Sequence, residues 1–148
     1  MTLPGYRLFV AASWSLVLVG VLHSIGHFAG RPADHAAEQV FAAMGGYRLP
    51  LPFGMEPSVL DVFRDLSLTM AITLVGLGVQ NLLVAWYPKA SPPLLRRLAG
   101  GTLVVVGAVV GLKAFYRISP PLVLLTLVEA LFLLAWLRLR AQVVPAAH

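Results

Sequence analysis

The sequence predicts an all-α fold, an integral membrane four-helix bundle, and three properties of the chain support this prediction. Hydrophobic residues make up 59% of the 148 residues and charged residues only 11%, whereas soluble domains carry roughly 25% charged residues. The mean hydropathy is +0.85. Four apolar runs also have the length of a membrane span, which is about 20 residues. These properties exclude a soluble enzyme, and the lack of cysteine excludes disulfides and thiolate chemistry.

The four apolar runs cover residues 6–29, 66–87, 98–116 and 120–137. Their ends carry aromatic side chains, which anchor spans at the membrane surface, namely Tyr6, Trp86, Tyr87, Tyr116 and Trp136. The first run also resembles a signal peptide, with Arg7 ahead of it and small residues, Ser24 and Gly26, near a cleavage point. Its length favours a retained span, so residues 1–148 are predicted to form one domain with four spans.

The long loop between the first two runs, residues 30–65, is predicted to lie outside the cell. The short loop after the second run carries Lys89, Arg96 and Arg97, and basic residues in short loops mark the cytoplasmic side. Both termini are then cytoplasmic. The net charge of +5 is spread over the ends of the spans, where it contacts lipid head groups, and this argues against a nucleic-acid partner.

Local signals divide the outer loop into three parts. Asp34 is a suitable N-cap for a short amphipathic helix that ends near Met44 and lies along the membrane surface. Residues 49–54 predict an extended apolar segment. Ser58 is a suitable cap for a helix that continues into the second span. At the other end of the chain, residues 141–148 predict a disordered tail.

Small and polar residues at helical spacing indicate which face of each span meets the bundle, because helices in lipid associate by close packing. The third span is predicted to be the most closely packed, since its stripe is rich in glycine. The stripes are Leu16, Gly20, His23, His27 and Gly30 in the first span, Asp65, Thr69, Thr73, Gly76 and Gln80 in the second, Gly100, Val104, Gly107 and Gly111 in the third, and Thr126 with Glu129 in the fourth.

Glu129 is the most informative single residue, because a carboxylate at mid-membrane costs several kcal/mol unless it is paired, hydrated or protonated. One interpretation is structural, with Glu129 joined to Gln80, Asn81 or Thr73 of the second span. The other is functional. In that case the residues that bind a ligand or handle protons are Glu129, Gln80, Asp65, Thr69 and Thr73.

His23 and His27 lie one helical turn apart, so their imidazoles can converge on one ligand. The general base of an HExxH motif is missing, which excludes a zincin-type protease. With a third ligand the pair would bind a divalent metal, zinc, copper or nickel. The residues on the same side that offer this third ligand are His35, Asp34, Glu38, Asp61 and Asp65. Haem is a second possible cofactor. The remaining interpretation is a pair of interfacial histidines that are hydrogen-bonded to the loop.

The order of these features resembles a known group of proteins. Gly20 and His23 close the first span, a longer outer loop follows, and the second span opens with Asp65-Leu66-Ser67-Leu68 and contains Gly76 and Gly78. This sequence resembles the small four-helix membrane proteins of bacteria, and in layout it is also similar to the DoxX-like proteins. The resemblance implies the fold and a location in the bacterial inner membrane, and it transfers no catalytic residue.

Two classes of function follow from these observations. The first is a binding or accessory membrane protein that holds a small ligand, a quinone or a metal on the outer side, with lipid, subunits of a larger complex or a second copy as partners. The second is a redox or proton-linked membrane enzyme that uses His23 and His27 as a metal or haem site together with Glu129.

Overall fold

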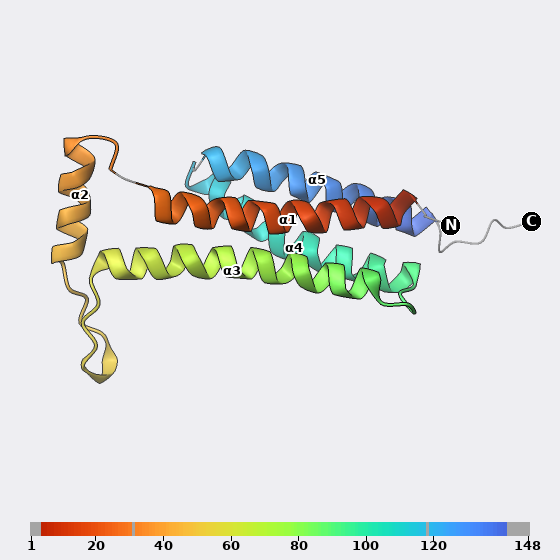
Figure 1. Ribbon diagram of the computed structural model, residues 1–148, viewed down its shortest axis with the longest axis horizontal. Coiled ribbons are helices and arrows are strands. Elements are labelled where there is room, and N and C mark those ends of the chain that lie inside the picture. The colour runs from red at the N-terminus through yellow and green to blue at the C-terminus, as the bar shows by residue number, and fades with distance from the viewer. Residues whose placement is uncertain (1–3, 31, 118, 142–148) are drawn as a thin grey trace, which may run out of the picture. The chain divides into compact units, whose positions relative to one another are not determined.

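A computed structural model describes residues 4–30, 32–117 and 119–141. In this part of the chain the fold consists of helices without a β-strand, and Figure 1 shows their course. Four helices are long and apolar enough to cross a membrane, which confirms the predicted helical class and the number of candidate spans. The helices are α1 (Pro4–Ala29), α2 (His35–Gly46), α3 (Val59–Trp86), α4 (Pro92–Phe115) and α5 (Ser119–Ala141), with a single 3-10 turn, η1 (Pro52–Gly54).

All four long helices begin before the predicted apolar runs, because a first helical turn accommodates proline and capping residues, and α5 also ends beyond its run. α3 begins seven residues before the run that starts at 66, where Ser58 and Asp61 form a capping box. α4 begins with Pro92 and Pro93 at its first two positions, which proline tolerates because the first turn lacks hydrogen-bonded N–H groups. α5 includes Ala141, and the rest of the predicted disordered tail, 142–148, lies outside the described residues.

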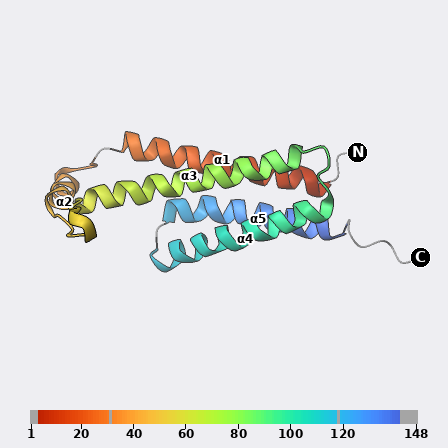
Figure 2. The ribbon, with the colours of Figure 1, turned by 90° about the horizontal axis from the view of Figure 1, so that it is seen from below.

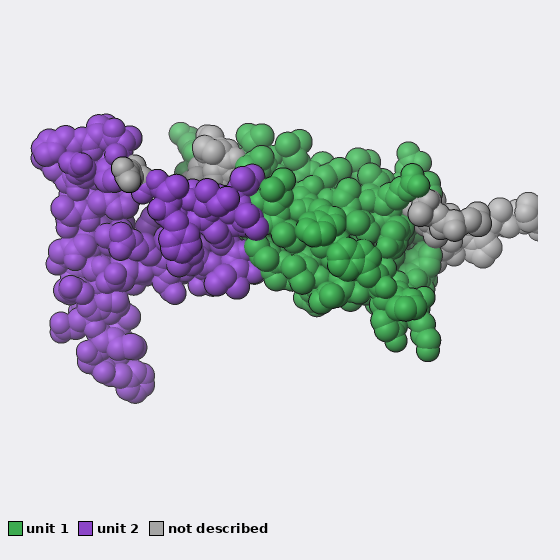
Figure 3. All heavy atoms as spheres, in the orientation of Figure 1, with its two compact units in different colours: residues 1–19, 74–148 green, residues 20–73 purple. Residues whose placement is uncertain are grey.

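The described residues fall into two compact units, shown in Figure 3. In the first unit, residues 1–19 and 74–148, four helical segments pack side by side (Figure 2). α1 contacts α5 through Phe9 and Phe132, whose rings meet edge to face with centroids 5.9 Å apart. α3 contacts α1 and α4, and α4 contacts α5. The four segments therefore form a ring in which α3 and α5 are diagonal to each other.

The core of this first unit is apolar and tightly packed. Phe9, Leu16, Leu125, Phe132 and Leu139 are almost fully buried. Gly5, near the start of α1, contacts Leu139, near the end of α5. The first and last helices are therefore antiparallel, and their terminal ends lie at the same end of the bundle, as an even number of spans requires.

The prediction that the third span is the most closely packed is wrong. Only 17% of the apolar stretch of α4 is buried, against 28% to 33% for the other three spans. Gly107 does face α5, but Gly111 has open space around it and Val104 is 74% exposed. The glycines of α4 thus occupy more than one face of the helix, and its buried stripe consists of Leu95, Ala99, Thr102 and Val106.

The second unit, residues 20–73, contains the end of α1, α2, η1 and the start of α3. Asp34 caps α2 as predicted, because its carboxylate accepts a hydrogen bond from the backbone N–H of Ala37 at 2.8 Å. The segment 49–54 was predicted to be extended, but its second half, Pro52–Gly54, forms the 3-10 turn η1. The segment is part of a finger that we define as residues 47–59. Its two arms are joined by an isolated antiparallel bridge between Arg48 and Ser58, and η1 forms the turn at its tip.

Candidate functional site

The second unit brings two histidines of α1 to one serine of α3. His23 Nε2 lies 2.9 Å from Ser67 Oγ, and His27 Nδ1 lies 3.2 Å from the same oxygen. All three side chains are half-buried. The histidines share a face because four residues advance the helix by little more than one turn. We refer to His23, His27 and Ser67 as the histidine–serine cluster.

The hydrogen atoms available in the cluster restrict its protonation. A serine hydroxyl donates one hydrogen and accepts through two lone pairs, so it can donate to only one of the two ring nitrogens. When it donates to one of them, the other imidazole presents an N–H to the serine oxygen; when both imidazoles present an N–H, the serine oxygen accepts both. The histidine–serine cluster is therefore an arrangement through which a proton can be relayed between two imidazoles, with the serine hydroxyl as the bridge.

The structure joins His23 and His27 but does not bring His35 to them. His35 is exposed on α2, where its Nδ1 lies 3.4 Å from Glu38 Oε2 and its Nε2 lies 3.4 Å from Gln39 Nε2. Glu38 and Gln39 lie three and four residues after His35 in α2, so these are contacts within one helix face. Among the described residues no three His, Cys, Asp or Glu side chains are grouped to hold a metal ion.

The expectation that the polar stripe of the second span faces the bundle is wrong. Asp65, Thr69, Thr73, Gly76 and Gln80 are all exposed in the chain. The face that packs carries a different stripe at three- and four-residue spacing, from Ser67 through Ala71, Leu74, Gly78 and Asn81 to Ala85. Sequence reasoning missed Ser67 because two polar stripes run along this helix. The signal that identifies the packed one is its sequence of small residues, Ser67, Ala71, Gly78 and Ala85.

Glu129 contacts a different helix from the one predicted. A carbon added at the Cβ position of Gly107 would lie 2.8 Å from Glu129 Oε1, so the carboxyl group fills the notch that this glycine leaves on α4. The predicted partner Gln80 is exposed on α3. No hydrogen bond links the two among the described residues, and the ring order gives the reason, because α3 is diagonal to α5.

The contact of Glu129 with Gly107 predicts how substitutions of Glu129 change the stability of the protein. Glu129→Gln is expected to keep the thermal stability of the wild type in detergent, because the amide fills the same notch. Glu129→Ala is expected to lose about 1 kcal/mol of unfolding free energy, since the notch is left empty. Thr126→Ala is the control, because its exposed hydroxyl donates only to Leu122 O of its own helix. Equal losses for Gln and Ala would mean that the residue is held as a charged group.

A second group of polar side chains lies inside the first unit. Asn81 is 1% exposed and donates through Nδ2 to Thr102 Oγ1 at 3.0 Å. Its Oδ1 is buried without a hydrogen-bond partner among the described residues. A separate contact on α4 is made by Arg96, whose guanidinium carbon lies 4.9 Å from the centre of the Trp136 ring of α5. These contacts tie α4 to α3 and α5, and none of the residues involved was predicted as a site.

The fold and the site together define a class, an all-α protein with four candidate membrane spans and a half-buried histidine–serine cluster. Comparisons of the chain with protein-family models, with characterised proteins and with solved structures find no match.

Proposed function

We propose that the protein is a small multi-pass membrane protein that binds a ligand at the histidine–serine cluster. The observation that supports this function best is the convergence of two imidazole nitrogens on one hydroxyl, at 2.9 and 3.2 Å. Polar groups inside membrane proteins are costly and are retained mainly where they pair or serve a function. Three of them from two helices, gathered at one point, form a polar site that an apolar bundle does not need for packing.

The ligand class that fits is a membrane-soluble molecule with hydrogen-bonding oxygens, such as a quinone. His27 Nε2, the ring nitrogen that faces away from Ser67, has no hydrogen-bond partner among the described residues. A ligand carbonyl can accept a hydrogen bond from it. The ring of Phe28 lies edge to face with His27 at 5.1 Å and is 76% exposed, so an apolar ligand ring would have a surface to pack on.

A transition metal or haem, in a redox or proton-linked enzyme, is the second candidate function. It is favoured by the direction of the two ring nitrogens, which both point at one position. A metal in place of the Ser67 hydroxyl would need nitrogen distances of about 2.0–2.1 Å, shorter than the present 2.9 and 3.2 Å. Small rotations of the imidazoles would bring them closer. Glu129 would then serve as a separate proton-handling group in the bundle.

Binding to purified protein in lipid nanodiscs tests the proposal, with a short-chain ubiquinone analogue, Zn²⁺ and haem as the probes. We expect the quinone analogue to bind the wild type and Ser67→Ala to weaken it about fivefold to tenfold, the equivalent of about 1 kcal/mol for one lost hydrogen bond. Ser24→Ala is the matched control, because this hydroxyl donates only to Gly20 O of the same helix.

The variants also separate the two candidate functions. A quinone site is expected to be weakened by both Ser67→Ala and His27→Ala. A metal site would survive Ser67→Ala, which leaves both ring nitrogens in place, and would be lost in His27→Ala. If the wild type binds none of the three probes, or if Ser24→Ala has the same effect as Ser67→Ala, the cluster is structural and the proposed function is wrong.

The location and partners proposed for the protein follow from the same features. We place it in the bacterial inner membrane with both termini in the cytoplasm, supported by the basic loop between α3 and α4 and by the DoxX-like layout. We also propose that α2 lies along the outer surface of the membrane, where its exposed side chains Val40 and Phe41 would meet lipid. The exposed polar stripe of α3 is the surface for a second copy or for another membrane subunit, because lipid alone would leave its Gln80 amide unsatisfied.

A further inference from the structure

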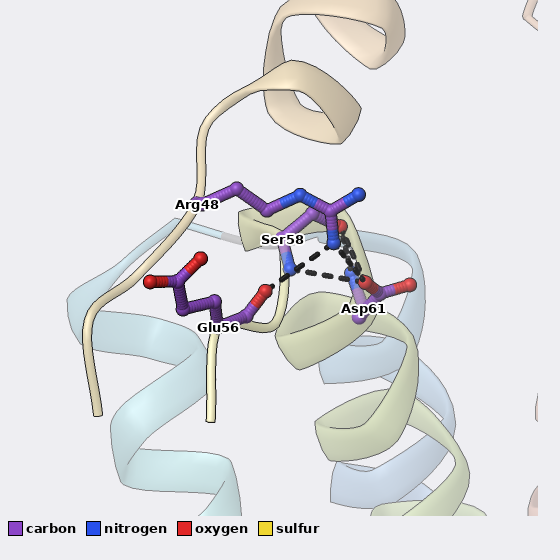
Figure 4. Close-up of polar contacts among 4 residues, drawn as sticks. All are labelled: Arg48, Glu56, Ser58 and Asp61. Carbon is purple, nitrogen blue, oxygen red and sulfur yellow. Dashed lines mark hydrogen bonds and ion pairs between the residues drawn. The ribbon is translucent and has the colours of Figure 1, made fainter. Parts of the chain in front are cut away.

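The finger, residues 47–59, separates charged from apolar residues along its length. At its base Arg48 Nη1 donates to the backbone carbonyl of Glu56 at 3.3 Å and lies 3.9 Å from Asp61 Oδ2 (Figure 4). Asp61 in turn accepts hydrogen bonds from the backbone N–H and the hydroxyl of Ser58. The tip, residues 49–55, contains no charged residue. Charge is thus confined to the end of the finger that adjoins α3.

The tip exposes apolar side chains on a backbone that has few unpaired donors. Leu51, Phe53 and Met55 are 43%, 98% and 53% exposed. Pro50 and Pro52 have no N–H, and the N–H groups of Leu49 and Leu51 donate to carbonyls of the opposite arm, Pro57 O and Met55 O, each at 2.9 Å. Such a tip can enter a medium of low polarity with few N–H groups left without a partner.

Phe53 does not stabilise the folded chain by itself. Its backbone is left-handed, with φ 67° and ψ 20°, a region that glycine, asparagine and aspartate adopt more readily than a bulky residue does. Its side chain is 98% exposed and so makes almost no packing contact. A large apolar residue in a strained position is expected only where something outside the chain covers it.

The position of the finger identifies what covers it. α2 and the finger connect the end of α1 to the start of α3, which are two candidate spans, so both lie where apolar span meets water. In Figure 1, α2 lies across the ends of α1 and α3, and the finger extends beyond α3. The adjoining turns of α3 expose Phe63 and Leu66, at 52% and 63%. The first turns of α3, which follow the finger directly in the chain, thus expose apolar side chains, and lipid covers such side chains in a membrane protein.

We propose that the finger is an interfacial membrane anchor whose tip, led by Phe53, inserts into the lipid next to α3. Arg48, Glu56 and Asp61 stay at the level of the head groups and water. The anchor holds α2 flat across the ends of the spans, which are the parts of α1 and α3 that carry the histidine–serine cluster. The inference rests on the proposed membrane location and is independent of the ligand.

The test uses the full chain in phospholipid nanodiscs and exploits its lack of cysteine. A single cysteine at Met55, labelled with an environment-sensitive fluorophore, leaves Phe53 in place. Quenching is measured with a doxyl-labelled phospholipid and with iodide in the water. We expect the lipid quencher to be at least threefold more effective than iodide. In the same background Phe53→Asn should reverse this preference, while protein stability in detergent is unchanged or higher, because asparagine suits the left-handed backbone.

A second label separates failure of this inference from failure of the membrane proposal. Val104 of α4 is 74% exposed within a candidate span, so a label on Val104→Cys should be quenched by lipid whatever residue stands at 53. If the label at position 104 is quenched by lipid but the label at position 55 by iodide, the finger lies in water and the proposed membrane anchor is wrong. Protection of Met55 from both quenchers would mean that a protein covers the tip, which also overturns the proposal. If neither label meets lipid, the chain does not span the bilayer.

Discussion

Gly78→Ala is expected to lower the free energy of unfolding by about 2 kcal/mol or more, because it inserts a methyl group where α3 and α1 already touch. A Cβ at this position would lie 2.7 Å from Val17 Cγ2 and 2.8 Å from the backbone oxygen of Ser13. The valine methyl group can move, but the clash with the backbone oxygen can be relieved only if the two helices separate. Thermal unfolding of the purified protein in detergent measures the effect.

Gly76→Ala is the matched control for this variant. Gly76 lies on the same helix, two residues earlier, and a Cβ there would meet nothing within 4 Å. The alanine is expected to be neutral or mildly stabilising, since glycine is the poorer helix former by about 1 kcal/mol. If the two alanine variants have the same stability, α1 and α3 do not cross at Gly78, and the arrangement of the first unit is wrong at that point.

Phe132→Ala is expected to lower the free energy of unfolding by about 3 kcal/mol, within the range found for large-to-small changes in protein cores. Phe132 is fully buried, and its ring meets Phe9 edge to face at an interplanar angle of 80°. The substitution removes this aromatic pair, worth about 1 kcal/mol in itself. It also leaves a cavity between α1 and α5, which can close only if the two helices move toward each other.

Phe115→Ala provides the comparison at an exposed phenylalanine. Phe115 is 79% exposed near the end of α4, so its removal is expected to change the unfolding temperature in detergent by far less. The two variants delete the same atoms and each removes one edge-to-face aromatic contact, so the main difference between them is burial. A loss at Phe115 equal to that at Phe132 would place the core of the bundle elsewhere.

The candidate site divides into a part that the sequence predicted and a part that it did not. His23 and His27 were found because a spacing of four residues places two side chains on one helical face whatever the helix packs against. Ser67 was missed because its relation to them depends on how α3 is rotated about its own axis. In a soluble protein that rotation is indicated by the apolar face, but a span is apolar on all sides, and packing in lipid depends on small differences of shape.

Local chemistry by itself determined much of this protein. The four candidate spans follow from run length and composition, and the starts of α2 and α3 follow from Asp34 and Ser58, because a helix cap depends on residues within one turn. Only the tertiary structure decided which helices are neighbours. It placed Glu129 against Gly107 instead of Gln80, since α3 and α5 are diagonal in the first unit, and it exposed the stripe from Asp65 to Gln80 that spacing assigned to the interior. The physical reason is that helix formation is encoded by contacts three and four residues apart, whereas the order and rotation of helices depend on contacts between segments far apart in the chain.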